Sequence, residues 1–199
     1  MDTNLHKLSL LTLPECSCWT ESYDWMHCKY LGFHQYSHGS TFAVLVNMVT
    51  PSSPEENLKN AWTFLKSYFK NNKTPTPFRY INKLSMFVRM NRFPKLRGKA
   101  SEVRHLGPAL RALWHAYMKP AIALHRKILT MLKCNVGLEQ MLTEFKEDFA
   151  FPAGPVKLLK KHVTICCCCT HKWLSTFWKK GSSIMTSPAR VTFVSILQC

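Results

Sequence analysis

The chain has 199 residues, of which 46% are hydrophobic and 12% are aromatic. This length and composition suffice for one domain with a real core and argue against wholesale disorder. The 27 Lys and Arg against 11 Asp and Glu give a net charge of +16, which favours a polyanionic partner, nucleic acid first and an anionic membrane surface second.

Cysteine usage and hydropathy indicate in which cellular compartment the chain is expected. Nine cysteines, an odd number, without a recognisable secretory leader indicate free thiols and a reducing environment, so we expect the nucleus or the cytoplasm. The longest apolar run, residues 41–49, is about half the length of a membrane-spanning helix, so no transmembrane segment is expected.

Residues 1–20 show no sustained period of hydrophobic residues and are expected to be a loose lead-in or a short strand.

The segment that follows holds the one candidate chemical centre, because Asp24, His27 and Cys28 stand within five residues. An acid and a histidine three positions apart share one side of a helical turn, where the carboxylate suits Mg²⁺ or Mn²⁺. The alternative is structural: Asp24 caps a helix and His27 is a hydrogen-bonded partner within the core.

Residues 33–39 carry His34 and His38 at a four-residue spacing, followed by Gly39. The glycine argues against a long helix, so we expect a solvent-exposed polar turn. The apolar run 41–49 is a buried strand or a helix, and periodicity does not decide between them.

The clearest boundary lies at residues 50–54. Ser53 is expected to cap a helix, with Pro54 at its first position and Glu56 completing a capping box. The helix should end near residues 71–72. Its apolar stripe, predicted to be core, comprises Leu58, Ala61, Trp62, Leu65, Tyr68 and Phe69.

Residues 73–77 form a stiff Pro-containing connector that leads into a basic, aromatic stretch at 78–92. Two interpretations stay open for this stretch: a groove for nucleic acid, or an amphipathic helix whose Lys and Arg stems cover its own core edge. The basic residues predicted to contact nucleic acid are Lys66, Lys70, Lys73, Arg79, Lys83, Arg89, Arg92, Lys95, Arg97, Lys99, Arg104 and Arg111.

Further helices follow. Ser101 is expected to cap a helix that reaches Tyr117 and is kinked or broken at Gly107 and Pro108, with His105 and His115 in structural roles. Helices at about 121–133, 138–149 and 154–162 come next, separated by residues 135–137 and 151–152. The acids Glu139, Glu144, Glu147 and Asp148 are predicted to form a solvated helix face.

The tail, residues 163–199, changes character. It begins near Cys166, Cys167, Cys168 and Cys169 and continues as a basic, Ser- and Thr-rich stretch. Contiguous cysteines do not fit one tetrahedral metal site. S-acylation of these four thiols would tether the chain to a membrane, but we favour a divergent, poorly ordered end.

Two segments resemble a known family. Residues 24–32, Asp-Trp-Met-His-Cys-Lys-Tyr-Leu-Gly, resemble the region around the second catalytic aspartate of CACTA-type (En/Spm-like) transposases. Residues 95–114 are similar to the Lys-rich, His-containing helix that follows there. The likeness spans roughly residues 22–162 and extends to transposase-derived proteins of dinoflagellate genomes. It implies an RNase H-like metal site in which Asp24 and His27 would take part.

Catalysis by two metal ions needs several converging carboxylates, and Asp24 is the one candidate that the chain offers. We therefore expect a mainly α-helical, irregular bundle of about five to seven helices over residues 21–162, a transposase-derived fragment that is not an enzyme. It is expected to need no cofactor and no small-molecule substrate, and to bind nucleic acid without sequence preference. The alternatives are a Mg²⁺- or Mn²⁺-dependent nuclease subunit that uses Asp24, or a membrane-associated protein acylated at Cys166 to Cys169.

Overall fold

The computed structural model describes residues 26–49, 52–89 and 92–147, together with 154, 155, 157, 158, 160–162 and 164. These residues are mainly helical, as predicted, and the one β-type pairing among them is an isolated bridge between Arg89 and Arg92. The lead-in expected at 1–20 and the tail expected at 163–199, apart from residue 164, lie outside the described residues. None of the described helices combines the length and the apolar character needed to cross a membrane.

The first helical rod runs without a break from residue 26 to residue 49. It consists of the π-helical η2 (Met26–His34), the α-helix α1 (Gln35–Val44) and the π-helical η3 (Leu45–Val49). The prediction of a solvent-exposed turn at 33–39 is therefore wrong, and residues 41–49 are helical. Gly39 allows close packing instead of ending the helix: a Cβ at this position would lie 2.6 Å from the backbone nitrogen of Leu96.

The helix α2 (Pro54–Asn71) begins and ends where the sequence predicts. The Ser53 hydroxyl accepts a hydrogen bond from the backbone N–H of Glu56 at 3.3 Å, as expected for a capping residue. Four members of the predicted stripe, Leu58, Ala61, Leu65 and Phe69, are buried, and Trp62 and Tyr68 pack against the core from its edge. The amide of Asn57 donates to the Val46 and Ser52 carbonyls at 2.8 Å each, which fixes α2 against η3.

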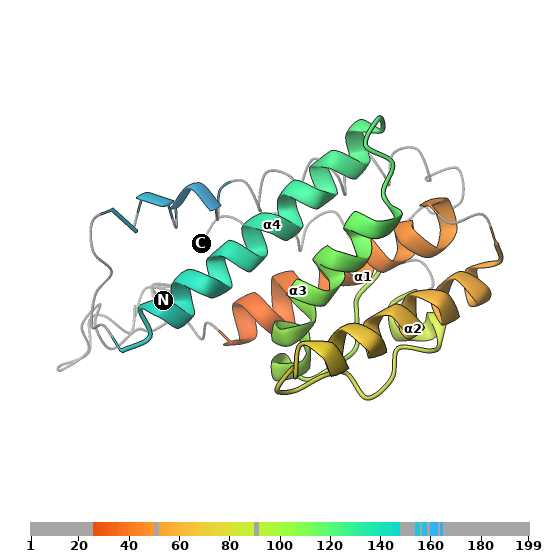
Figure 1. Ribbon diagram of the computed structural model, residues 1–199, viewed down its shortest axis with the longest axis horizontal. Helices are drawn as coiled ribbons and strands as arrows, with labels where there is room; N and C mark the ends of the chain where they lie inside the picture. The colour runs from red at the N-terminus through yellow and green to blue at the C-terminus, as the bar shows by residue number, and fades with distance from the viewer. Residues whose placement is uncertain are drawn as a thin grey trace, which may run out of the picture.

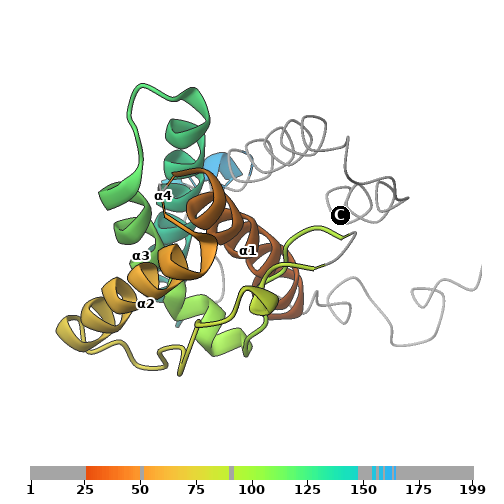
Figure 2. The ribbon, with the colours of Figure 1, turned by 90° about the vertical axis from the view of Figure 1, so that its right-hand side faces the viewer.

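The described residues between 73 and 99 form no α-helix, so the amphipathic-helix interpretation of 78–92 is wrong. The chain runs back alongside α2 to the short 3₁₀ helix η4 (Leu84–Met86), as Figures 1 and 2 show. Residues 86–89 then pair with residues 92–97: Lys95 N–H donates to the Phe87 carbonyl at 2.9 Å and Arg97 N–H to the Met86 carbonyl at 2.8 Å. We call residues 86–89 and 92–97 the basic hairpin.

The helix α3 (Ala100–Tyr117) is continuous through Pro108, so the predicted break is absent. Packing along α3 outweighs the backbone hydrogen bond that proline removes. The helix starts two residues earlier than Ser101 capping would place it, because Lys99 is the capping residue, and the backbone N–H of Lys99 donates to the Glu102 carboxylate at 2.9 Å. Tyr117, the last residue of the helix, is 36% exposed.

The helix α4 (Ala123–Glu144) is a single helix where the sequence predicts two. Residues 135–137 are helical, and Gly137 lies at a close contact instead of a break, since a Cβ there would lie 2.9 Å from a ring carbon of His162. The described residues of the last predicted helix, 154–162, are helical.

The core is arranged around α3, which lies between α4 and α2 in Figure 1 and also contacts η2, α1 and η3. Its inward side chains are completely buried: Val103, Leu106, Ala109, Leu110, Leu113 and Trp114. The Trp114 indole donates to the His125 carbonyl at 3.0 Å, and Lys119 N–H donates to His125 Nδ1 at 2.9 Å. These bonds close the connection between α3 and α4.

Two helical glycines should respond oppositely to a methyl group. Gly39→Ala should lower the free energy of unfolding by about 1–3 kcal/mol, because the new Cβ meets the Leu96 backbone. Gly107→Ala, whose Cβ would meet nothing within 4 Å, should raise it by about 0.5–1 kcal/mol. Urea denaturation of both variants measures the two changes, and a stabilising Gly39→Ala would contradict the packing described for the hairpin.

Candidate nucleic-acid interface

The predicted chemical centre is only partly described. Asp24 lies outside the described residues, while His27 and Cys28 lie exposed at the start of η2. Among the described residues, no group of three or more His, Cys, Asp or Glu side chains is placed to hold a metal ion. The Asp24 metal site therefore stays a prediction.

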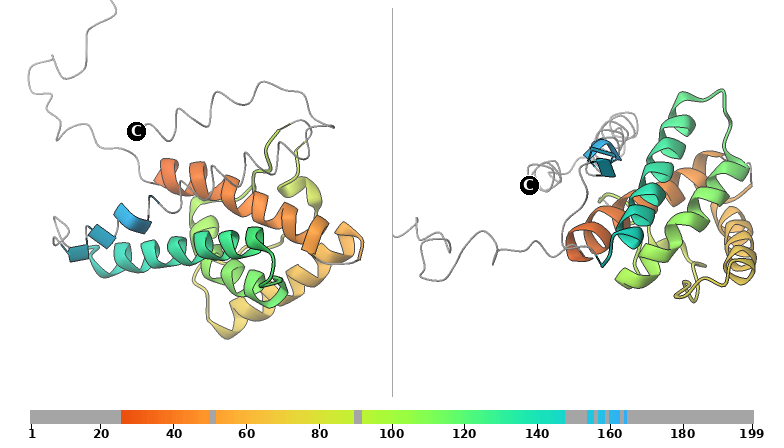
Figure 3. Two further views of the ribbon diagram at one scale, coloured as in Figure 1. Left: turned by 90° about the horizontal axis from the view of Figure 1, so that it is seen from above. Right: turned by 60° about the vertical axis from the view of Figure 1, so that its left-hand side comes forward.

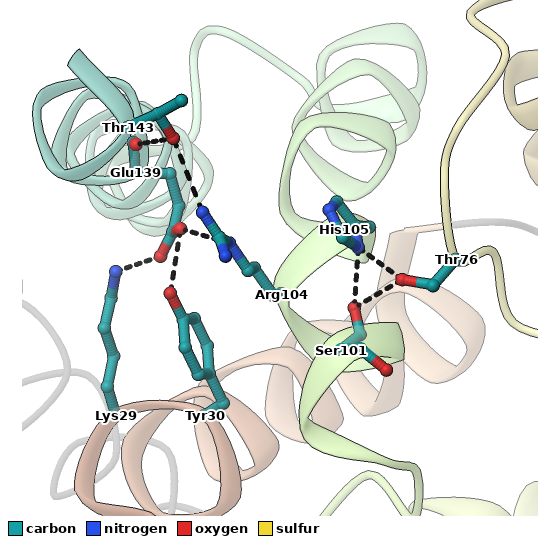
Figure 4. Close-up of polar contacts among 8 residues, drawn as sticks. All are labelled: Lys29, Tyr30, Thr76, Ser101, Arg104, His105, Glu139 and Thr143. Atoms are coloured by element: carbon teal, nitrogen blue, oxygen red, sulfur yellow. Dashed lines mark hydrogen bonds and ion pairs between the residues drawn. The ribbon is translucent and has the colours of Figure 1, made fainter. Parts of the chain in front are cut away.

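A buried ion-pair network lies directly behind this motif (Figure 4). It is centred on Glu139 of α4, whose carboxylate accepts hydrogen bonds from the Lys29 ammonium, from the Tyr30 hydroxyl at 3.0 Å and from Arg104 Nε at 3.1 Å. Arg104 also donates to the hydroxyl of Thr143 at 3.4 Å. The network thus joins η2, α3 and α4 at one carboxylate.

Burial makes this network sensitive to the loss of any one partner. The Lys29 and Glu139 side chains are 5% and 14% exposed, and the Arg104 side chain is 41% exposed. Burial raises the pKa of Tyr30, the adjacent Glu139 carboxylate raises it further, and Arg104 acts in the opposite direction. Tyr30 is therefore a neutral hydrogen-bond donor at physiological pH. The prediction that Glu139 belongs to a solvated face is wrong, because two cations and a phenol surround its carboxylate.

Glu139→Gln should destabilise the fold by about 3–5 kcal/mol, because it removes the negative charge that compensates two cations in a poorly solvated place. Glu144→Gln, an exposed position on the same helix, is the control and should change stability by less than about 0.5 kcal/mol. Urea denaturation at pH 7 measures both. Equal, small effects would show that the network contributes little.

A second unpredicted feature is a pair of buried imidazoles. His34 and His38 are 2% and 0% exposed, and their ring centroids lie 5.1 Å apart. Neither ring nitrogen of His38 has a hydrogen-bond partner among the described residues. Burial lowers the pKa of His38 to about 3, helped by the nearby Lys29 charge. Burial also lowers the pKa of His34, with smaller contributions from His38 and Lys29 in the same direction and from Asn135 in the opposite one.

These shifts make stability depend on pH. The unfolded chain takes up protons on both histidines near pH 6.5, whereas the folded chain does so only at lower pH, so acid favours the unfolded state. Stability should be constant above about pH 6.5 and fall below it, by about 2 kcal/mol at pH 5 from His38 alone, with His34 acting in the same direction. Denaturation curves from pH 7.5 to 5 measure this decline. His38→Leu should make the slope shallower, and an unchanged slope would contradict the assignment.

The predicted nucleic-acid contacts are mostly exposed. Arg89, Lys95, Arg104 and Arg111 are half-buried, and Arg104 is engaged by Glu139. The other eight are exposed, and together we call them the basic surface: Lys66, Lys70, Lys73, Arg79, Lys83, Arg92, Arg97 and Lys99. They come from α2, the segment 73–83, the basic hairpin and the start of α3. No Asp or Glu occurs between Glu56 and Glu102, so no acid from this part of the chain offsets their charge.

The basic hairpin is fixed against α1, beside which it lies in Figure 3. Leu96 N–H donates to the Gln35 carbonyl at 2.8 Å, and the Gln35 amide donates to the Gly98 carbonyl at 3.0 Å. Phe87 and Leu96 are completely buried, which anchors both strands of the hairpin. Its cations are consequently held by a structured base and do not depend on a free loop.

Cations of the basic hairpin also contact an aromatic ring. The Arg89 guanidinium and the Lys95 ammonium lie 5.6 Å and 5.2 Å from the Tyr36 ring centroid. Cation–π contacts of this kind hold long side chains in place. Arg89 Nε also donates to the Phe93 carbonyl at 3.0 Å. Arg89 and Lys95 therefore contribute charge from defined positions near the hairpin.

Comparison of the chain with protein-family models, curated proteins and solved structures finds no match. Function is therefore inferred from the residues and their arrangement.

The sequence did not predict Lys29, Tyr30 and Glu139 as a group. The one local signal for their burial is that Glu139 stands between the buried Leu138 and Met141.

Proposed function

We propose that this chain binds nucleic acid without sequence preference through the basic surface. The observation that carries the proposal is the combination of eight exposed cations with the absence of any acid between Glu56 and Glu102. Phosphate contacts by Lys and Arg release counterions and supply most of the free energy of non-specific binding. A net charge of +16 favours long-range attraction of a polyanion as well.

The rigid support of this surface distinguishes it from an ordinary solvated basic face. Lys66 and Lys70 project from a capped helix, and the cations of the hairpin extend from a base that is hydrogen-bonded to α1. Charges on fixed backbone elements lose less conformational entropy when they meet a phosphate backbone. The arrangement supports binding to the shape and charge of the backbone, and no residue set in it is organised to read base edges.

We further propose that the chain is transposase-derived and not catalytic. One carboxylate, Asp24, is too few ligands for two divalent ions. Glu139, the acid that contacts η2 in the ion-pair network, is already bonded to Lys29, Tyr30 and Arg104.

Binding should be strongly salt-dependent. In fluorescence anisotropy titrations with labelled DNA and RNA, the logarithm of the association constant should fall linearly with the logarithm of salt concentration, by about 0.9 per phosphate contacted on duplex DNA. Absence of binding at low salt would refute the proposal.

Charge reversal at matched positions locates the surface. Lys66→Glu with Lys70→Glu should weaken binding and flatten the salt dependence, because both lysines belong to the basic surface. Lys127→Glu with Lys133→Glu, two exposed positions on α4, changes the net charge equally and should weaken binding much less. Equal losses in the two double variants would show that net charge acts without a defined surface.

A further inference from the structure

One aromatic side chain on the basic surface is unusually exposed. Tyr80 is 57% exposed, the highest value among the large hydrophobic residues that the structure describes. It stands next to Arg79 and three residues before Lys83, which are both exposed. A single exposed tyrosine often has no function. Whether Tyr80 has a binding role therefore depends on how its backbone is supported and on which residues surround it.

The backbone around Tyr80 is anchored on both sides. Phe78 is 5% exposed and Ile81 is completely buried. The Phe78 ring packs so closely on Gly98 that a Cβ there would lie 2.4 Å from the ring. Upstream, the Thr76 hydroxyl donates to the Ser101 carbonyl at 3.2 Å and is hydrogen-bonded to His105 of α3 (Figure 4). Tyr80 is therefore presented from a fixed segment.

The Tyr80 ring also differs from that of Tyr36, which contacts the basic hairpin. The Tyr36 ring has Arg89 and Lys95 close to it. Among the described residues, no aromatic ring and no cation packs on the ring of Tyr80. Its face is thus open to an incoming planar group, and its neighbours in the sequence include the exposed cations Arg79 and Lys83.

An open aromatic ring beside cations suits single-stranded nucleic acid. In a single strand, bases expose their faces and stack on aromatic side chains, while Lys and Arg follow the phosphates. In a duplex, the bases are already stacked on one another and offer no face to Tyr80. The segment 73–83 runs alongside α2 and carries the exposed Arg79 and Lys83 on either side of Tyr80 in the sequence, so it offers both cations for phosphates and a ring for a base.

We infer that the basic surface takes single-stranded nucleic acid in preference to duplex, with Tyr80 as the residue on which a base stacks. The inference rests on the proposed function and adds the class of nucleic acid and the residue that discriminates it. It requires no reaction and no metal ion.

The test compares the full-length chain with Tyr80→Ala, Tyr80→Phe and Tyr117→Ala, using a labelled oligothymidine of about 20 nucleotides and a blunt duplex of equal length. Tyr117 is a second exposed tyrosine, at the end of α3, and serves as the control. Tyr80→Ala should weaken single-strand binding about 5- to 150-fold, the loss of one stacked base. Its binding to the duplex should not change, and Tyr80→Phe and Tyr117→Ala should bind both probes like the natural chain.

The outcomes separate the inference from the proposed function. If the natural chain binds neither probe at low salt, the proposed function fails and the inference fails with it. If the natural chain binds both probes but Tyr80→Ala retains single-strand affinity within about twofold, or loses affinity for both probes equally, the stacking role is refuted and non-specific binding stands. Equal melting temperatures of the variants would show that an exposed side chain was changed without unfolding the chain.

Discussion

The carboxylate of Glu139 is the point on which the structure depends. It lies among apolar helices with its side chain 14% exposed, and it receives Lys29 and Tyr30 from η2 and Arg104 from α3. A charge this poorly solvated is tolerated only when its hydrogen bonds are satisfied. Helices that rely on apolar packing alone could slide along one another, whereas these three bonds fix how the first rod lies against α3 and α4.

That position matters because the first rod supports the candidate interface. The same rod that carries Lys29 and Tyr30 at its start carries Gln35 and Gly39 one and two turns later. Gln35 bonds the backbone of the basic hairpin, and Gly39 leaves room for it. Buried charge in the interior is thus connected, through one helix, to exposed charge on the surface. The proposed binding to nucleic acid depends on this surface being held in shape.

The sequence predicted what local chemistry decides. Ser53, Pro54 and Glu56 mark the start of α2, and its stripe from Leu58 to Phe69 is core as expected. Prediction failed where a residue's role depends on distant parts of the chain. Gly39 and Gly137 look like breaks, yet each lies inside a helix where another segment comes close. Glu139 looks like a solvated acid because its partners are 35 and 110 residues away. The basic surface was predictable from charge alone, but its anchoring was not.

The most direct test of the central role of Glu139 is a double-mutant cycle with Lys29. The free energy of unfolding would be measured for Lys29→Met, Glu139→Met and the double variant. The structure predicts that each single change strongly lowers the free energy of unfolding. The loss in the double variant should be smaller than the sum of the two single losses by more than about 1 kcal/mol, because the double variant leaves neither Lys29 nor Glu139 buried without its partner. Additivity within about 0.5 kcal/mol would contradict it, since uncoupled residues behave in that way.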